Sequence, residues 1–268
     1  MPAREVYPNA SVALAALEVR HPSARALSQA ALAKLKRRLS EHFPVFRSVQ
    51  VTQITASPQS SPDVRNLIIP KYFSRDSTMS VSIFEERFVI ETTRYVRWES
   101  FRELARLAFS ARQDVGEIDG IERIGLRYVD EIRVPEAIDS MTEWSEWVDS
   151  SLLGPSSISS DLKLKPVEWQ GVSVFEQFPG NNIVVRYGPR TGYAVDVTGD
   201  LKRPIPPPGP YFLIDIDSFW APDVIPEFNT DQMISICDEI HEPVNQIFES
   251  LITEKLRKEV LRNGPSGD

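Results

Sequence analysis

The sequence predicts an α+β fold: a curved mixed or antiparallel sheet with helices mainly on one face and a long C-terminal helix. Segments of alternating apolar and polar residues, bounded by Pro, Gly, Ser and Asn, recur in both halves of the chain and predict strands. Other segments carry apolar residues at helical spacing. The 268 residues are 41% hydrophobic and 25% charged, which provides enough apolar sequence for a sizeable core.

The first half predicts a strand, a helix, further strands, a second helix and a last strand. Pro44 ends the first helix because proline cannot continue one, and Gly116 is a stop for the second. The segment 57–62 is rich in Ser and Pro and predicts a loop. The expected strands are 12–19, 46–54, 81–85, 88–93 and 124–134, and the expected helices are 25–42 and the segment from Trp98 toward Gly116.

An acidic stretch, residues 135–160, connects the two halves. Ser140 and Glu143 match a capping box, and Trp144 and Trp147 follow at helical spacing. The stretch therefore predicts a short amphipathic helix followed by a Ser-rich connection. Its tryptophans have two interpretations, which are packing on the protein's own core and docking of a partner.

The second half, residues 161–262, predicts an antiparallel meander followed by a long helix. The helix starts near Asn229 and carries an apolar stripe as far as Ile252, while Pro243 within it predicts a kink or break. Residues 263–268 are expected to be disordered. Since residues 1–134 also end a run of strands with a helix, the halves suggest an internal duplication. The expected strands are 172–178, 183–187, 193–197 and 211–219, with a proline-rich connection at 204–210.

Charge is divided unevenly along the chain, whose formal net charge is −8. Residues 1–134 carry 20 Lys and Arg against 16 Asp and Glu, whereas residues 135–268 carry 10 against 22. The acidic second half suits a basic partner. Nucleic-acid binding is not expected, because it needs a concentrated basic stripe that the sequence lacks.

Hydropathy and cysteine content predict the compartment. No apolar segment approaches the ~20 residues that cross a bilayer, so we expect no membrane association. The single cysteine, Cys237, cannot form an intrachain disulfide and fits a reducing environment. We therefore expect a cytoplasmic protein.

Two segments carry a resemblance to a known family. They are the strand Ile-Gly-Leu-Arg-Tyr-Val-Asp-Glu-Ile at 124–132 and the helix Ile-His-Glu-Pro-Val-Asn-Gln-Ile-Phe-Glu-Ser-Leu-Ile-Thr-Glu at 240–254. The chain resembles a sporadically distributed, uncharacterised bacterial protein family of about this length. In that family a GLRY(I/V)(N/D)xI strand and a C-terminal HExxxxxFExxIT helix recur. The resemblance implies one whole-chain architecture and carries no activity with it.

Few residues stand out as candidates for chemistry. Asp215 and Asp217 alternate along one strand, so their carboxylates share a face, and Asp196 on a neighbouring strand would complete a three-carboxylate metal site. The alternative is a solvated sheet face. His241 lacks the second histidine of a zinc-protease helix, and we expect it to bind backbone carbonyls that Pro243 frees.

Arg127 has two interpretations as well. It lies on the face of its strand opposite Tyr128, where it forms a structural ion pair or anchors an anionic ligand or partner.

Three functions remain open at this stage. The absence of catalytic, cofactor and phosphate-binding motifs favours a non-catalytic accessory protein, such as an inhibitor, an antitoxin or an assembly subunit. It would act through protein contacts at Trp144, Trp147 and Arg127. The alternatives are a small-ligand carrier or sensor with a cavity under the curved sheet, and a metal-dependent hydrolase using the Asp cluster. No cofactor is predicted, and the sequence predicts no oligomeric state.

Overall fold

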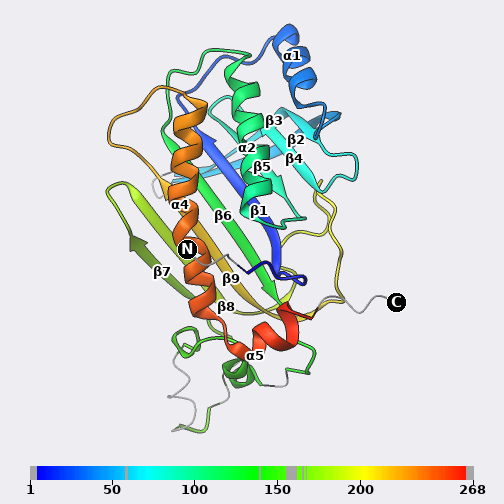
Figure 1. The fold of residues 1–268 in the computed structure, drawn as a ribbon, viewed down its shortest axis with the longest axis vertical. Helices are drawn as coiled ribbons and strands as arrows, with labels where there is room; N and C mark the ends of the chain where they lie inside the picture. The colour runs from blue at the N-terminus through cyan, green and yellow to red at the C-terminus, as the bar shows by residue number, and fades with distance from the viewer. Residues whose placement is uncertain are drawn as a thin grey trace.

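The computed structural model describes residues 5–57, 60–138, 140–154, 162–164, 166 and 168–263. They form one nine-stranded sheet with the strand order β2-β3-β4-β5-β1-β6-β9-β8-β7 (Figure 1). Every neighbouring pair is antiparallel. The fold is therefore α+β, as predicted, and the sheet is antiparallel rather than mixed. The strands are β1 Val12–Arg20, β2 Val45–Ser57, β3 Ser60–Phe73, β4 Met79–Ile83, β5 Arg87–Thr92, β6 Arg123–Ile132, β7 Gly171–Glu176, β8 Asn181–Gly192 and β9 Gly209–Trp220.

The two halves of the chain meet edge to edge at β6 and β9. These strands pair from Ile124 opposite Trp220 to Ile132 opposite Phe212. On one side of the central pair β1–β6, the meander β3-β4-β5 leads into helix α2, and on the other side the meander β7-β8-β9 leads into helix α4. A strand meander followed by a helix thus occurs in each half.

The principal helices are α1 Gln29–Leu39, α2 Trp98–Gln113 and α4 Thr230–Leu251. Figure 1 shows α2 and α4 lying side by side across one face of the sheet, with α4 over β6 and β9. Two short turns of 3-10 helix, Met141–Glu146 and Ser150–Leu152, lie between β6 and β7. After α4 the chain continues through α5 Glu254–Leu256 into a π-helical turn at Arg257–Leu261.

Strand β1 buries one face against the helices and leaves the other half-buried. On β1, Ala13, Ala15, Leu17 and Val19 are buried against the helices, while the residues between them are half-buried. This is the period-two alternation of a strand that packs on one side only. We call the packed side the helix face. The opposite side, which carries Glu18, Arg123, Arg127, Asp215 and Asp217, is the open face.

Several element boundaries differ from the predictions. Helix α1 begins at Gln29, where the Ser28 hydroxyl accepts a hydrogen bond from Ala31 N at 3.2 Å, so the prediction of a helix from 25 was too long. Strand β3 was missed, and Ser60 to Pro62 of the predicted loop belong to it. Residues 58–59 lie outside the described residues. The predicted amphipathic helix near Trp144 consists of two 3-10 turns instead.

In the second half, the predicted strand 193–197 is irregular, and β8 runs on through Pro189 to Gly192. Pairing with β7 stops at Tyr187, so Pro189 has only β9 as a neighbour and its missing N–H disrupts no ladder. Helix α4 continues through Pro243 without the predicted break. The predicted disorder of 264–268 concerns residues outside those described.

Candidate functional site

Strand β6 and helix α4 meet in the fold. Tyr128 on β6 places its hydroxyl oxygen 3.2 Å from Nδ1 of His241 on α4. Alternation along β6 directs Tyr128 and Asp130 to the helix face together, where α4 crosses the strand. Asp130, Tyr128 and His241 are 3%, 4% and 5% exposed. A buried polar cluster therefore lies between the sheet and the longest helix.

Helix α2 fixes the imidazole from the other side. The Trp98 ring stacks on His241 with centroids 4.3 Å apart and planes inclined by 19°. Trp98 Nε1 donates to Asp238 at 2.8 Å, and Arg102 donates to both oxygens of the same carboxylate. Burial raises the pKa of Asp238, but the hydrogen bonds from Arg102 and Trp98 outweigh it and leave the pKa lowered. His241 thus lies between the Tyr128 hydroxyl and the Trp98 ring, and the backbone carbonyls predicted as its partners stay a prediction.

Asp130 is the most unusual group in this cluster. Its carboxylate accepts a 2.7 Å hydrogen bond from the Ser11 hydroxyl, and no cationic side chain among the described residues forms an ion pair with it. Burial raises the pKa of Asp130 from 3.8 to about 7, the Ser11 hydrogen bond opposes this, and the nearby Asp215 charge adds to it. A carboxyl group with this pKa exchanges its proton near neutral pH.

These groups line a cavity of about 100 Å³ that both halves of the chain enclose. Residues 5–7 and 10–12, Tyr95, Val96 and β6 contribute from the first half, and Ile216 and α4 contribute from the second. The cavity adjoins a wider cleft of about 990 Å³, because the two share the walls formed by residues 6–7 and 10–12, Tyr95 and Val96. The 100 Å³ space is called the inner cavity below, and the 990 Å³ space the outer cleft.

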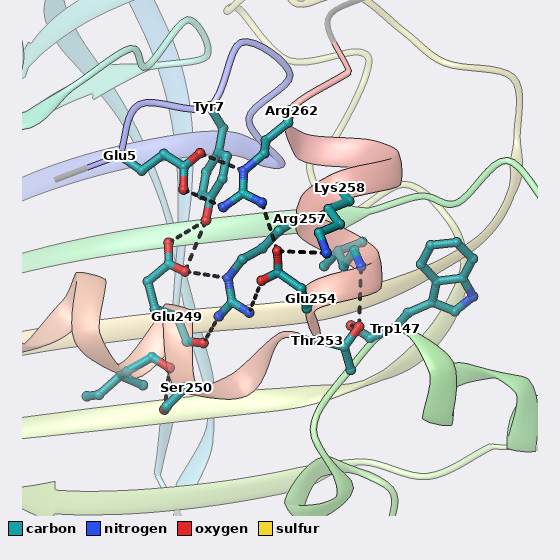
Figure 2. A network of polar contacts seen from close by, with 12 residues as sticks. Glu5, Tyr7, Trp147, Glu249, Ser250, Thr253, Glu254, Arg257, Lys258 and Arg262 are labelled. Atoms are coloured by element: carbon teal, nitrogen blue, oxygen red, sulfur yellow. Dashed lines mark hydrogen bonds and ion pairs between the residues drawn. The ribbon is translucent and has the colours of Figure 1, made fainter.

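The N-terminal segment that walls the inner cavity is fastened to the end of the chain. Figure 2 shows Tyr7 pointing at Glu249 and Glu5 pointing at Arg262. The Tyr7 hydroxyl donates to the Glu249 carboxylate at 2.9 Å, and Arg262 pairs with both Glu5 oxygens at 2.7 and 2.9 Å. Asn9 adds hydrogen bonds to the carbonyls of the last helical turn. The wall is thus held by side chains far apart in sequence.

A buried carboxylate, that of Glu131, also lines the outer cleft. Glu131 accepts hydrogen bonds from Arg133, from Arg203 and from the Ala194 backbone N–H, at 2.8 to 2.9 Å. Burial raises the pKa of Glu131, but these three donors outweigh it and leave the pKa lowered. The segment that leads from Arg203 into the proline-rich connection 204–210 is thereby attached to the end of β6.

The residues proposed from the sequence as partner contacts are mostly enclosed. Trp144 and Trp147 are 0% and 2% exposed, and the Trp144 ring lies 5.4 Å from that of Phe212 on the helix face. They pack on the core, which was the first of their two interpretations. Arg127 lies on the open face and pairs with Asp215 through Nε and Nη2, both at 2.7 Å.

The three predicted metal ligands do not come together. Asp215 and Asp217 do share the open face, but Asp215 binds Arg127 while Asp217 accepts from Arg123 at 3.3 Å. Asp196 lies in the irregular segment after β8 and binds Thr198. In the described part of the chain, no three His, Cys, Asp or Glu side chains are arranged to hold a metal ion.

Sequence reasoning overlooked Asp130, Ser11 and Tyr95. A signal for Asp130 was present, since it follows Tyr128 by two residues in a strand whose packed side was correctly predicted. Ser11 and Tyr95 lie in connections before β1 and after β5, where no periodic pattern marks them.

Comparison with known proteins adds no identity to the site. The chain matches no protein-family model and no curated protein. Among the helices that the structure describes, none has the length and apolar character needed to cross a membrane.

Proposed function

We propose that this protein binds a small molecule, as a carrier or sensor, in the inner cavity beneath α4. The observation that carries the proposal is the Asp130 carboxyl group, which is 3% exposed, lines a cavity and has Ser11 as its hydrogen-bond donor. Burying a carboxylate without a cation is costly, and placing it beside a cavity has no packing benefit. A ligand that pairs with Asp130 removes this cost.

The walls favour a cationic group on the ligand. Tyr7, Tyr95, Tyr128 and Phe248 line the inner cavity beside the carboxyl group. Aromatic faces and a carboxylate together are the surroundings that proteins use to bind ammonium groups. The volume of about 100 Å³ admits only a few non-hydrogen atoms, whereas the outer cleft of about 990 Å³ lies in the range of ordinary ligand sites. An amine head in the inner cavity with its body in the outer cleft fits both volumes.

Thermal unfolding with small amines tests the proposal. At pH 8, ethanolamine and choline are expected to raise the Tm of the native protein, and acetate is not. Asp130→Asn keeps the size of the side chain and an acceptor for Ser11 but removes the charge, so it should abolish the shift. Asp223→Asn changes an exposed carboxylate elsewhere and is the matched control. Equal shifts in native protein and Asp130→Asn, or no shift with either amine, would contradict the proposal.

A second candidate, contact with a protein partner, is favoured by the edge strand β7. Val172, Val174 and Phe175 are 63%, 62% and 51% exposed on a strand that has β8 as its neighbour on one side. An edge strand with exposed apolar side chains offers unpaired backbone groups to an incoming strand. The partner would then add a strand at β7 rather than contact Trp144 and Trp147.

Affinity purification from the native host, followed by mass spectrometry, tests this second candidate. A stoichiometric partner is expected with the native chain and should be lost with Val174→Lys, because a charge on an edge strand opposes strand addition. Val224→Lys, at an apolar residue that is 81% exposed outside the strands, is the control and should retain the partner. Recovery of the same partner with both variants would rule out β7 as the contact.

A further inference from the structure

A second buried charge lies far from the inner cavity, in the last turn of α2. Arg112 is 2% exposed. Its Nη1 reaches the Gly116 carbonyl oxygen at 3.4 Å, and its Nε has no hydrogen-bond partner in the described part of the chain. No carboxylate of the described residues forms an ion pair with it, whereas Arg38, Arg87 and Arg106 are each paired with a carboxylate. Arg112 is thus a buried guanidinium without a counter-charge.

A buried guanidinium without a counter-charge destabilises the fold unless an anion pairs with it. A guanidinium stays protonated at physiological pH, so Arg112 cannot relieve the cost by becoming neutral, even though burial lowers its pKa. A buried charge without a partner costs several kcal/mol, and an apolar residue of similar size would avoid that cost. The Gly116 carbonyl and the C-terminal end of the α2 dipole favour a cation here, but their contribution is smaller than that cost.

Arg112 lines a cavity of about 270 Å³ between α1, the strands β2 to β4, and the β4–β5 turn. The exposed Arg25, Glu85 and the half-buried Glu86 lie around this cavity, and Glu86 pairs with Arg87 at 3.1 Å. The apolar side chains of its wall are Leu27, Leu32, Phe46, Ile69, Ile83 and Phe84. One buried cation in an apolar cavity is the arrangement that binds an amphipathic anion.

Arg112 is the buried cation of this lining, since Arg25 is exposed, and Arg112 together with the neighbouring glutamates selects the class of anion. His21 lies close by, but burial and the Arg112 charge outweigh its hydrogen bond to Pro22 and lower its pKa, so its imidazole adds no positive charge. A phosphate dianion would need more donors than Arg112 offers, and it would face Glu85 and Glu86. A carboxylate matches the planar fork of one guanidinium.

We propose that this cavity binds a small monocarboxylate with an apolar body, whose carboxylate oxygens accept hydrogen bonds from Arg112 and whose hydrocarbon part contacts Leu27, Ile69 and Phe84. The volume of about 270 Å³ lies just below the range of drug-sized ligands and fits a short-chain or single-ring carboxylate. The site is separate from the inner cavity and does not depend on the function proposed for it.

Isothermal titration calorimetry with benzoate and hexanoate at pH 7.5 tests the proposal. The native protein is expected to bind at least one of them, and Arg112→Met should weaken that binding by about tenfold or more, because it removes a charge-assisted hydrogen bond. Arg106→Met, on the same helix but paired with Asp231 at the surface, should leave it unchanged. Equal affinity in native protein and Arg112→Met, or no binding of either carboxylate, would overturn the proposal.

Neutral and phosphate competitors define the ligand class. Benzamide has the shape of benzoate without its charge, and its affinity for the native protein should be lower than that of benzoate by about tenfold or more. Displacement of benzoate by inorganic phosphate at similar concentration would overturn the assignment to carboxylates. Asp130→Asn should bind benzoate with the same affinity as the native protein. The proposal for the Arg112 cavity can therefore fail without affecting the proposal for the inner cavity, and the reverse.

Two further measurements test the proposal without measuring ligand binding to Arg112→Met. In the native protein, the ¹⁵Nε resonance of Arg112 should shift on titration with benzoate, and a resonance that stays in place would contradict the contact. Without carboxylate, Arg112→Met should unfold at the same urea concentration as the native protein or a higher one, since an unpaired buried charge is removed. A large loss of stability would show that Arg112 supports the fold, which overturns the proposal.

Discussion

Replacing Asp130 with Asn should change how the stability of this protein depends on pH. In the folded protein the pKa of Asp130 is raised from 3.8 to about 7, with burial as the main cause. Between these two values the folded state keeps the proton while the unfolded state releases it, so rising pH favours unfolding. Above pH 7 both states have lost the proton and the effect no longer grows.

The magnitude follows from the displacement of the pKa. Each tenfold change in proton affinity corresponds to about 1.4 kcal/mol, so the change from 3.8 to about 7 amounts to about 4 kcal/mol at most. Asn carries no charge and removes this dependence. The free energy of unfolding of Asp130→Asn, minus that of the native protein, is therefore expected to rise between pH 4 and pH 7 and to level off above it.

Urea denaturation followed by tryptophan fluorescence at several pH values measures this difference. The slope with pH is the diagnostic quantity, because any loss from burying an amide N–H₂ without a partner is the same at every pH. Asp223→Asn, at an exposed carboxylate, should give a difference that is flat with pH. A flat difference for Asp130→Asn as well would refute the assignment of Asp130 as a buried carboxyl group that lacks a counter-charge.

Three further predictions concern the packing around the site. Trp144→Ala should lose about 3–5 kcal/mol of unfolding free energy, because the ring is 0% exposed, and Trp144→Phe should lose less, because Nε1 has no hydrogen-bond partner in the described part of the chain. Cys237 should react with a thiol reagent only in denaturant, since burial raises its pKa and shields it, and stopped-flow absorbance would reveal any faster native reaction. Tyr7→Phe should lower the free energy of unfolding by about 1 kcal/mol, because it removes the hydrogen bond to Glu249. It should also accelerate amide hydrogen exchange in residues 5–11, and unchanged exchange there would argue that this hydrogen bond does not hold the segment in place.

The parts of the fold that the sequence predicted are those with an uninterrupted period. Helix α2 and strand β6 have regular apolar spacing, and both appear where they were expected. Strand β3 was missed because Pro62 and Pro70 resemble loop residues. The structure accommodates Pro70 where β3 pairs with β2 alone, since pairing with β4 begins at Lys71. Which side of a strand lacks a neighbour is a property of the sheet order, and local sequence does not contain it.

The candidate site was inaccessible to sequence analysis for a related reason. Tyr128 and His241 were each noticed, but their contact joins residues 113 positions apart and depends on α4 crossing β6. The partner of Asp130, Ser11, lies in an irregular segment whose position is set by its attachment to the end of the chain. Periodicity indicates which face a residue occupies, but it does not indicate which residue of another element lies opposite.

The distribution of charge pairs argues that the two cavities are functional rather than structural. On the open face, the half-buried Arg123 pairs with Glu18 and Asp217, and Arg127 pairs with the buried Asp215. Inside the protein, where a missing partner costs most, Asp130 and Arg112 form no ion pair with any described residue and each lines a cavity. The fold thus pairs the buried carboxylates of Asp215 and Glu131 with arginines, whereas Asp130 and Arg112 lack an ion-pair partner and lie beside cavities. This is the arrangement expected if ligands supply the missing charges.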